Sequence, residues 1–285
     1  MNKELITLGE AMIVFIAENE GDFTDIENFS KGIAGAELNV SMGLSRLGHK
    51  VSYITRLGKD VFGNYIEDVI NKEGILSDSI SKDSDYSTGF YFKTKVKDGD
   101  PEVHYFRKNS AASQITCKDI ESTDFSGAKI LHITGITAAL SESTLDAVYK
   151  AIDKARENNM LITFDPNIRV QLWKSEEYMI EVLNNIASKC DVILPGIKEG
   201  VSKTFWTCSK DGVIKAPLSK GAANKLLEAI YWRGIHAVGV YEFAEGIGEF
   251  VHGTANPSTT FGGPPPFDKG GFAQKPSSPT FLTYT

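Results

Sequence analysis

The sequence has few cysteines and no close grouping of residues that bind metals. Its three cysteines, Cys117, Cys190 and Cys208, are odd in number and far apart, and its five histidines are also dispersed. Disulfide-rich secreted proteins and zinc sites both need such residues at short, regular spacings. The pattern therefore argues against a disulfide framework and favours reduced thiols. We predict a cytoplasmic protein and no metal site built from Cys or His.

The chain also lacks long apolar runs and an excess of basic residues. Charged residues at Lys3 and Glu4 interrupt the first ten positions, so we expect neither a signal peptide nor a membrane span there. The net charge of −7 over 285 residues argues against a nucleic-acid partner held by a broad basic surface. An anionic ligand must therefore be met by a local cluster of Arg or Lys.

Short apolar runs, typical of strands, alternate with apolar residues at helical spacing along most of the chain. Short apolar runs predict strands at 5–8, 51–55, 130–134, 161–165 and 191–194. Apolar side chains at helical spacing predict helices ending near Gly48 and at Gly74, and further helices at 143–158 and 175–187. Strands and helices that alternate in this way predict an α/β fold with a parallel sheet covered by helices.

Residues 88–107 instead alternate with period two around a hairpin signal at 97–100. A two-stranded ribbon is only marginally stable by itself. We therefore predict that it joins residues 12–17 in a small antiparallel sheet.

The loop before the first predicted helix, Ala34-Gly35-Ala36-Glu37-Leu38-Asn39, is suited to ligand binding. Glycine permits close approach to backbone, and Asn39 can donate and accept hydrogen bonds to a polyhydroxylated molecule. The alternative is a tight loop that only starts a helix. In parallel sheets ligands bind beyond the carboxyl ends of the strands, where Gly9-Glu10, Arg56–Gly58, Thr134-Gly135, Asp165-Pro166-Asn167 and Pro195-Gly196 lie.

Together, several motifs resemble the ribokinase-like (PfkB) carbohydrate kinases. The N-terminal signature of that family is matched by Gly32–Gly48 and by Gly58-x-Asp60-x-x-Gly63. Within the family the chain is most similar to 2-keto-3-deoxygluconate kinases. That similarity rests on residues 88–91, 105–113, 131–136 and 165–173, and the resemblance covers about residues 4–200.

The resemblance implies a doubly wound α/β domain spanning 1–285 with a small antiparallel β lid, formed by strands from about 11–31 and 86–110. Such lids often join two copies in a homo-oligomer. It also implies an ATP-dependent sugar kinase that uses Mg²⁺. The substrate residues that it implies are Gly35, Asn39, Tyr91, Tyr105, Arg107 and Arg169, and Glu199 is implied to act through water on magnesium and phosphate.

The chemistry of these side chains agrees with an acidic sugar as substrate. The planar guanidinium groups of Arg107 and Arg169 match a carboxylate and supply the local positive charge that the overall acidity requires. Tyr91 and Tyr105 lie on the two strands of the hairpin and could stack on a sugar from the same side. The alternative for Arg107 is a surface arginine, and the alternative for Arg169 is an ion pair that caps a loop. For the two tyrosines it is ring packing, and for Glu199 it is an ordinary acid at a helix start.

The second signature of the family, Asp-Thr-x-Gly-Ala-Gly-Asp, is not found after Gly200. The fragment Asp268–Ala273 lacks its second aspartate, and Lys220–Lys225 lacks the spacing of a P-loop, so no catalytic base is assigned. Residues 201–285 are atypical, and 253–285 are rich in Pro, Gly, Ser and Thr, which predicts irregular structure. Three explanations compete. The residues after about 200 could be wrongly recorded, through a frame disruption or uncertain assignment, and we favour this explanation. Otherwise the gene could be decayed, or a divergent C-terminal half could perform the same work.

These observations predict a kinase that transfers the γ-phosphate of ATP to the terminal hydroxyl of an acidic keto-sugar such as 2-keto-3-deoxygluconate. Two alternatives remain: a sugar-acid-binding homologue without a catalytic base, and a kinase for a neutral sugar or nucleoside.

Overall fold

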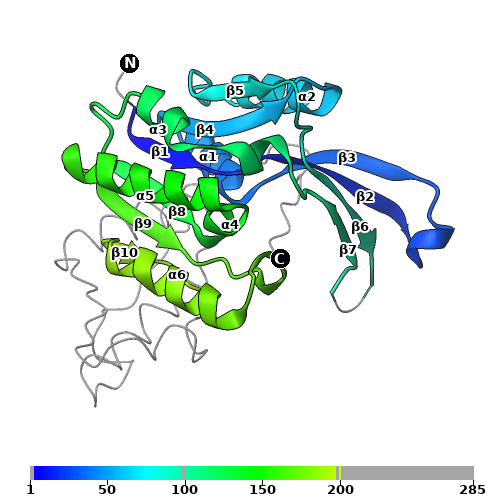
Figure 1. Ribbon diagram of the computed structural model, residues 1–285. Coiled ribbons are helices and arrows are strands. Elements are labelled where there is room, and N and C mark those ends of the chain that lie inside the picture. Colours follow the sequence, from blue (N-terminus) through cyan, green and yellow to red (C-terminus); the bar gives the residue numbers. More distant parts are fainter. Residues whose placement is uncertain (1–2, 98–99, 197–198, 200–285) are drawn as a thin grey trace, which may run out of the picture. The chain divides into compact units, whose positions relative to one another are not determined.

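The computed structural model describes residues 3–97, 100–196 and 199. These residues form two sheets, one packed between helices and one projecting from the carboxyl edge of the first (Figure 1). Several expectations fall outside the described residues: the hairpin turn at 98–99, Cys208, the absent second signature, and all structure after residue 199. No helix in the described part is long and apolar enough to cross a membrane.

The first sheet, sheet A, is parallel throughout and has six strands in the order β10-β9-β8-β1-β4-β5. Four of its strands were predicted within three residues at each end, and β10 is shorter than expected. The strands are β1 (Leu5–Leu8), β4 (Val51–Gly58), β5 (Ile80–Asp83), β8 (Ile130–Thr134), β9 (Leu161–Asp165) and β10 (Val192–Ile193). The polar strand β5 was missed because Ile-Ser-Lys-Asp carries no apolar run.

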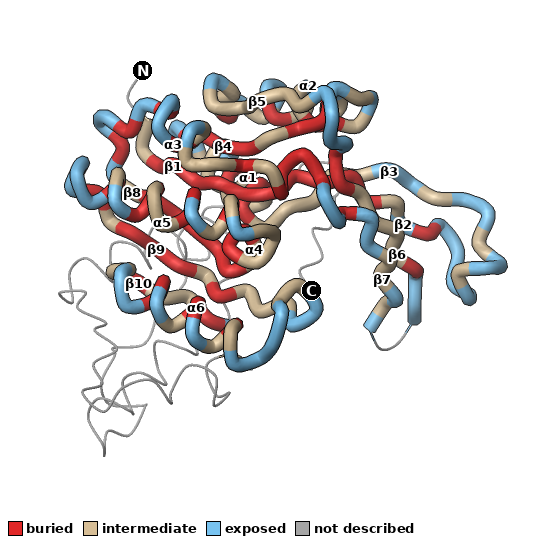
Figure 2. Tube along the Cα trace, viewed as in Figure 1, coloured by how far each residue is buried: buried red, intermediate tan, exposed pale blue. Residues whose placement is uncertain are grey.

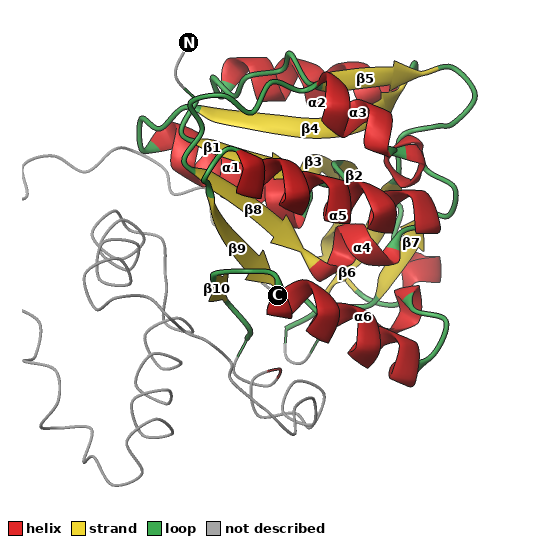
Figure 3. Cartoon of the chain, turned by 60° about the vertical axis from the view of Figure 1, so that its left-hand side comes forward, coloured by secondary structure: helices red, strands yellow, loops and turns green. Residues whose placement is uncertain are grey.

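Helices cover both faces of sheet A (Figure 3). The α-helices are α1 (Ala36–Arg46), α2 (Val61–Lys72), α3 (Cys117–Ser122), α4 (Gly135–Ala139), α5 (Glu142–Glu157) and α6 (Glu176–Ser188). Three short 3-10 turns are η1 (Phe23–Asp25), η2 (Ala111–Gln114) and η3 (Val170–Leu172). The four longer α-helices were predicted, whereas α3 and α4 are too short for a periodic pattern to identify them.

Local chemistry fixes where these helices begin and end. Gly48 and Gly74 have φ of 88° and 74°, and each follows a helix whose last carbonyls its backbone N–H helps to satisfy. Ser141 and Ser175 accept hydrogen bonds from the backbone N–H groups of Thr144 and Tyr178, which caps α5 and α6.

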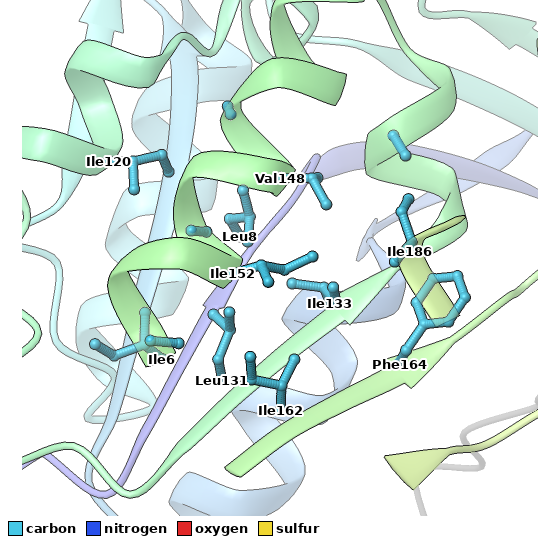
Figure 4. Packing of buried hydrophobic residues seen from close by; sticks show 14 of the residues in the cluster. Ile6, Leu8, Ile120, Leu131, Ile133, Val148, Ile152, Ile162, Phe164 and Ile186 are labelled. Carbon is cyan, nitrogen blue, oxygen red and sulfur yellow. The ribbon is translucent and has the colours of Figure 1, made fainter. Parts of the chain in front are cut away.

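The main hydrophobic core lies between sheet A and helices α3, α5 and α6. Side chains of alternate positions on β1, β8 and β9 point into it, and Figure 4 shows Ile6, Leu8, Leu131, Ile133 and Phe164 gathered against the helices. A second cluster under α1 and α2 includes Leu38, Tyr53 and Ile66. The central strands are therefore buried on both sides (Figure 2), which explains why they appear as short apolar runs.

The second sheet, sheet B, has four strands in the order β3-β2-β6-β7. They are β2 (Met12–Glu20), β3 (Phe29–Ala34), β6 (Phe90–Lys95) and β7 (Val103–Phe106). The hairpin partners pair antiparallel, but β2 and β6 pair parallel, so the sheet is mixed and differs from the antiparallel sheet that we expected. A parallel pair needs a long connection, and here the chain passes through α1, β4, α2 and β5 between β2 and β6.

Phenylalanines stabilise sheet B on one face. Phe15 of β2 stacks on Phe92 of β6 with ring centroids 5.1 Å apart, and Phe90 stacks on Phe106 of β7 at 4.9 Å. Phe62 of α2 also lies 5.8 Å from Phe15 and joins this cluster to the main body. Such contacts between aromatic rings add to the burial of their apolar surface.

Candidate functional site

The candidate substrate loop at Gly35 has a backbone that only glycine adopts easily. Gly35 has φ of 150°, and a Cβ there would lie 2.5 Å from the carbonyl oxygen of Glu10. It is the N-cap of α1 and offers no side chain to the first-turn N–H groups. Asn39 lies in that first turn, half-buried, and its backbone N–H donates to the carbonyl of Gly35. Backbone donors and the Asn39 amide thus lie on the same helix end.

The two predicted tyrosines are direct neighbours in sheet B. Tyr91 of β6 is opposite Tyr105 of β7, and their ring centroids are 5.1 Å apart. Burial raises the pKa of Tyr91 to about 12, and the neighbouring Tyr105 adds to that shift. Tyr91 therefore stays a neutral hydroxyl that can donate a hydrogen bond, while Tyr105 has 41% of its surface exposed.

Arg107 lies next to this ring pair and forms a buried ion pair with Glu10, which lies on the connection from β1 to β2. Its Nη2 is 2.5 Å from Oε2 of Glu10, and its Cζ is 5.6 Å from the ring centroid of Tyr105. Arg107 and Glu10 are only 9% and 2% exposed, and Ser110 donates a short hydrogen bond to the other oxygen of Glu10. Glu10 was expected only as a strand-end residue, so its pairing with Arg107 is a finding of the structure.

A second acid beside the loop, Glu37, turns into the protein. It is 1% exposed and accepts hydrogen bonds from Thr134 and Thr137, at 2.5 and 2.6 Å. Burial raises the pKa of Glu37, and the two hydroxyl hydrogen bonds only partly oppose this. Sequence reasoning did not assign it a role, because an acid in the first turn of a helix usually faces solvent.

The loop after β9 brings further oxygen atoms to the carboxyl edge of sheet A. Asp165 accepts hydrogen bonds from the backbone and side-chain nitrogens of Asn167, at 3.0 and 3.2 Å, and Asn167 has φ of 39°. Arg169 is half-buried and donates to the carbonyl of Ile168 at 3.0 Å. Its guanidinium therefore lies along the loop at the end of β9.

Glu199 ties this loop to the end of β10. Its carboxylate accepts hydrogen bonds from the backbone N–H groups of Ile168 and Gly196, at 2.6 and 2.8 Å. Burial and the nearby charge of Glu199 raise the pKa of Asp165 to about 7. In the described residues Oδ1 of Asn167 is buried and has no hydrogen-bond partner. Carboxylate and amide oxygens suit Mg²⁺, and a cation here would favour the ionised Asp165, so these residues fit the ion.

The structure thus assembles the predicted residues in two groups. Gly35, Tyr91, Tyr105 and Arg107 are linked through Glu10 where sheets A and B join, with Asn39 one helical turn beyond Gly35. Arg169 and Glu199 lie together on the loops after β9 and β10. The second group follows the carboxyl ends of the parallel strands β9 and β10, and Glu10 of the first group follows the parallel strand β1, at the edge where α/β sheets bind ligands.

Comparison with known proteins identifies the family. The model of the pfkB family carbohydrate kinases matches residues 2–221. The 2-dehydro-3-deoxygluconokinase of Bacillus subtilis is 39% identical over 224 residues, which are 78% of this chain and 69% of that protein. Fructokinase-2 of Solanum lycopersicum is 30% identical over 66% of this chain and 58% of its own length.

Solved structures agree with this assignment. The PfkB protein from Polaromonas sp. JS666 superposes with a TM-score of 0.68 at 41% identity, over 71% of this chain and 68% of that chain. An uncharacterized sugar kinase of Pyrococcus horikoshii, solved in complex with ATP, gives a TM-score of 0.60 at 32% identity over 66% of this chain and 62% of its own. The strand order, the second sheet and the matched motifs lead to one conclusion: the chain belongs to the pfkB family of carbohydrate kinases.

Proposed function

We propose that this protein is an ATP-dependent kinase of an acidic keto-sugar of the 2-keto-3-deoxygluconate type. The observation that carries the proposal is the guanidinium of Arg107, held beside the Tyr91 and Tyr105 rings where the two sheets meet. Similarity to the 2-dehydro-3-deoxygluconokinase of Bacillus subtilis supports the same substrate class. A carboxylate is the ligand that a planar guanidinium matches best.

In this proposal the residues where sheets A and B join hold the sugar. Arg107 binds the carboxylate, the two tyrosines contact the carbon chain and its hydroxyls, and Gly35 and Asn39 provide backbone and amide hydrogen bonds. Arg169 provides further positive charge. These contacts orient the terminal hydroxyl and exclude water from it.

The acids at the carboxyl edge of sheet A serve the nucleotide side. When bound, ATP supplies the phosphoryl group and Mg²⁺ neutralises charge on its phosphates. Asp165, Asn167 and Glu199 present the oxygen atoms that could hold the ion, directly or through water. We assign no catalytic base, because the sequence after Gly200 lacks the family signature that supplies one.

The decisive assay measures ATP-dependent phosphorylation of 2-keto-3-deoxygluconate beside fructose, ribose and adenosine. We expect the sugar acid to give the highest kcat/KM. The variant Arg107→Lys keeps a positive charge opposite Glu10 but loses the planar fork, so it should raise KM for the acid about tenfold. The matched control Arg46→Lys alters an arginine that pairs with Glu73 on the surface and should change nothing.

A second candidate, a kinase for a neutral sugar, is favoured by one observation. Glu10 already neutralises Arg107, so the charge available for a carboxylate is smaller than the sequence suggested. Fructokinases are also among the relatives. Turnover of fructose that exceeds turnover of the acid, with no effect of Arg107→Lys, would establish this candidate. Binding of the acid without transfer, measured by calorimetry, would instead establish a binding protein that lacks a base.

We also propose a cytoplasmic location and association of two copies through sheet B. Cys117 and Cys190 are free thiols, which agrees with a reducing compartment. Phe106 of β7 is 54% exposed at the end of the phenylalanine face of sheet B, so this face offers apolar surface to a partner. Sedimentation of wild type and Phe106→Lys tests the association.

An intact mass and peptide map of the purified protein would decide between the three explanations for residues 201–285.

A further inference from the structure

Glu10 occupies the point where the four chain connections between sheets A and B meet. It lies itself on the connection from β1 to β2. The connection from β3 to α1 touches it at Gly35, where a Cβ would be 2.5 Å from the Glu10 carbonyl oxygen. The connection from β5 to β6 touches it at Gly89, where a Cβ would be 2.7 Å from Glu10 Oε1. The connection after β7 supplies Arg107 and Ser110.

The Glu10 carboxylate is built into this junction, with one oxygen in an ion pair and the other in a hydrogen bond. Oε2 faces Nη2 of Arg107 at 2.5 Å and Oε1 accepts the Ser110 hydroxyl, while the side chain as a whole is 1% exposed. A carboxylate removed from water to this extent is stable only with a positive partner and hydrogen bonds. The position of Glu10 and the orientation of Arg107 therefore depend on each other.

Arg107 is held on two sides and has donor groups left over. Glu10 contacts one terminal nitrogen, and the Tyr105 ring lies 5.6 Å from Cζ. In the described part of the chain Nε and Nη2 of Arg107 are buried and make no hydrogen bond, although Nη2 is in the ion pair with Glu10. A buried N–H without a partner is costly, and an incoming oxygen ligand would satisfy it. An arginine already fixed in one rotamer loses less side-chain entropy when that ligand binds.

We propose that Glu10 is a positioning residue for recognition of the substrate carboxylate: it fixes the guanidinium of Arg107, and through Arg107 it sets the preference for an acidic over a neutral sugar. This inference rests on the proposed function, since it takes Arg107 as the carboxylate ligand. Glu10 does not touch the substrate. Its effect is therefore on affinity for the acid and not on the rate of phosphoryl transfer.

The test compares two ligands that differ only in charge. Affinities of the full chain for 2-keto-3-deoxygluconate and for its uncharged amide are measured by calorimetry, and KM and kcat are measured for both. Glu10→Gln keeps the shape of the side chain and removes the charge. We expect it to weaken binding of the acid about 10- to 100-fold, because it removes the buried ion pair with Arg107 and the charge on the acceptor of the Ser110 hydrogen bond. Binding of the amide should change less than about threefold, with kcat unaltered.

Three further variants keep the test informative if Glu10→Gln folds poorly. Glu10→Asp retains the charge and should recover part of the preference for the acid. Ser110→Ala removes only the second hydrogen bond to Glu10 and should weaken acid binding in the same direction by a smaller factor. Glu73→Gln removes the carboxylate that pairs with Arg46 on the surface and should leave both affinities as in wild type.

The outcomes separate this inference from the proposed function. If wild type binds the acid and Glu10→Gln weakens acid and amide equally, the proposed function stands and Glu10 is only structural. If Ser110→Ala and Glu10→Asp behave as wild type toward both ligands, the positioning role is also refuted. If wild type does not prefer the acid to the amide, the carboxylate assignment of Arg107 is wrong, and this inference falls with it.

Discussion

Asp60 joins helix α2 to the chain entering sheet B, and its replacement gives the sharpest test of how the sheets are coupled. Its Oδ1 accepts the backbone N–H of Gly63 at 2.7 Å, which caps α2. Its Oδ2 accepts the backbone N–H of Thr88 at 2.8 Å, two residues before β6. The hydroxyl of Thr88 in turn accepts the N–H of Gly58 at 3.0 Å. One carboxylate thus closes a ring between β4, α2 and β6.

We predict that Asp60→Ala lowers the free energy of unfolding by about 2–4 kcal/mol. Loss of the helix cap accounts for about 1 kcal/mol of this. The N–H of Thr88, in a residue only 3% exposed, is left without its acceptor, which costs a further 1–3 kcal/mol or so. The loss should exceed that of an ordinary capping residue because two segments far apart in sequence are released together.

Urea unfolding monitored by circular dichroism measures this difference. The matched control is Ser175→Ala, because Ser175 caps α6 through Tyr178 and makes no hydrogen bond to a distant segment among the described residues, so it should cost only about 1 kcal/mol. Burial alone raises the pKa of Asp60, but hydrogen bonds from Gly63 and Thr88 outweigh burial and lower it. The stabilisation by Asp60 is therefore present above pH 3.8 and lost as the pH falls through its lowered pKa. Equal losses for Asp60→Ala and Ser175→Ala at pH 7 would refute the reasoning.

Three more predictions follow from the same structure. Gly35→Ala forces a Cβ against the Glu10 carbonyl at a φ of 150° and should cost about 1–3 kcal/mol in urea unfolding and weaken sugar binding in calorimetry. Burial and Glu199 raise the pKa of Asp165 to about 7, so its contribution to stability is present at low pH and is lost as the pH rises from 3.8 through 7. Asp165→Asn should therefore make the urea midpoint independent of pH between about pH 4 and 7. Saturating Mg²⁺ should shift this pH-dependent loss of stability in the wild type to lower pH. Phe164→Ala empties a fully buried core position and should cost about 3–5 kcal/mol, measured by the same unfolding assay.

Much of sheet A and its covering helices could be predicted because each element carries a strong local signal. β8 and β9 begin and end at the predicted residues, since β-branched and apolar side chains fill strands that are buried on both faces. The parallel pairing of β2 with β6 could not be predicted. It depends on contacts between segments more than seventy residues apart, such as Phe15 with Phe92, and period-two patterns do not carry strand direction.

The structure brings the two predicted tyrosines together and gives the predicted arginine a partner that the sequence did not reveal. Tyr91 and Tyr105 were expected on the same side of a hairpin, and the structure pairs them directly. Arg107 was expected to contribute a free positive charge, but Glu10, distant in sequence, pairs with it. Nothing in the local sequence marks Glu10 as buried, because a charged residue after a short strand is typical of a surface loop. Only the tertiary arrangement brings its partner to it.

The glycines of the motifs also leave room for buried carboxylates of the protein itself. A Cβ at Gly9 would lie 2.2 Å from the carboxylate carbon of Glu37, one at Gly89 would lie 2.7 Å from Glu10 Oε1, and one at Gly58 would lie 2.1 Å from Asp60 Oδ2. Each glycine therefore makes room for a carboxylate of the protein itself, in addition to any ligand. Since Glu37 belongs to the Gly35 loop and the Glu10 carbonyl lies against Gly35, these internal acids fix the backbone of the loop that we propose binds the sugar. Substitution of Gly9 or Gly89 by alanine should accordingly disturb binding through the buried acid it displaces, even where the new methyl group never meets the ligand.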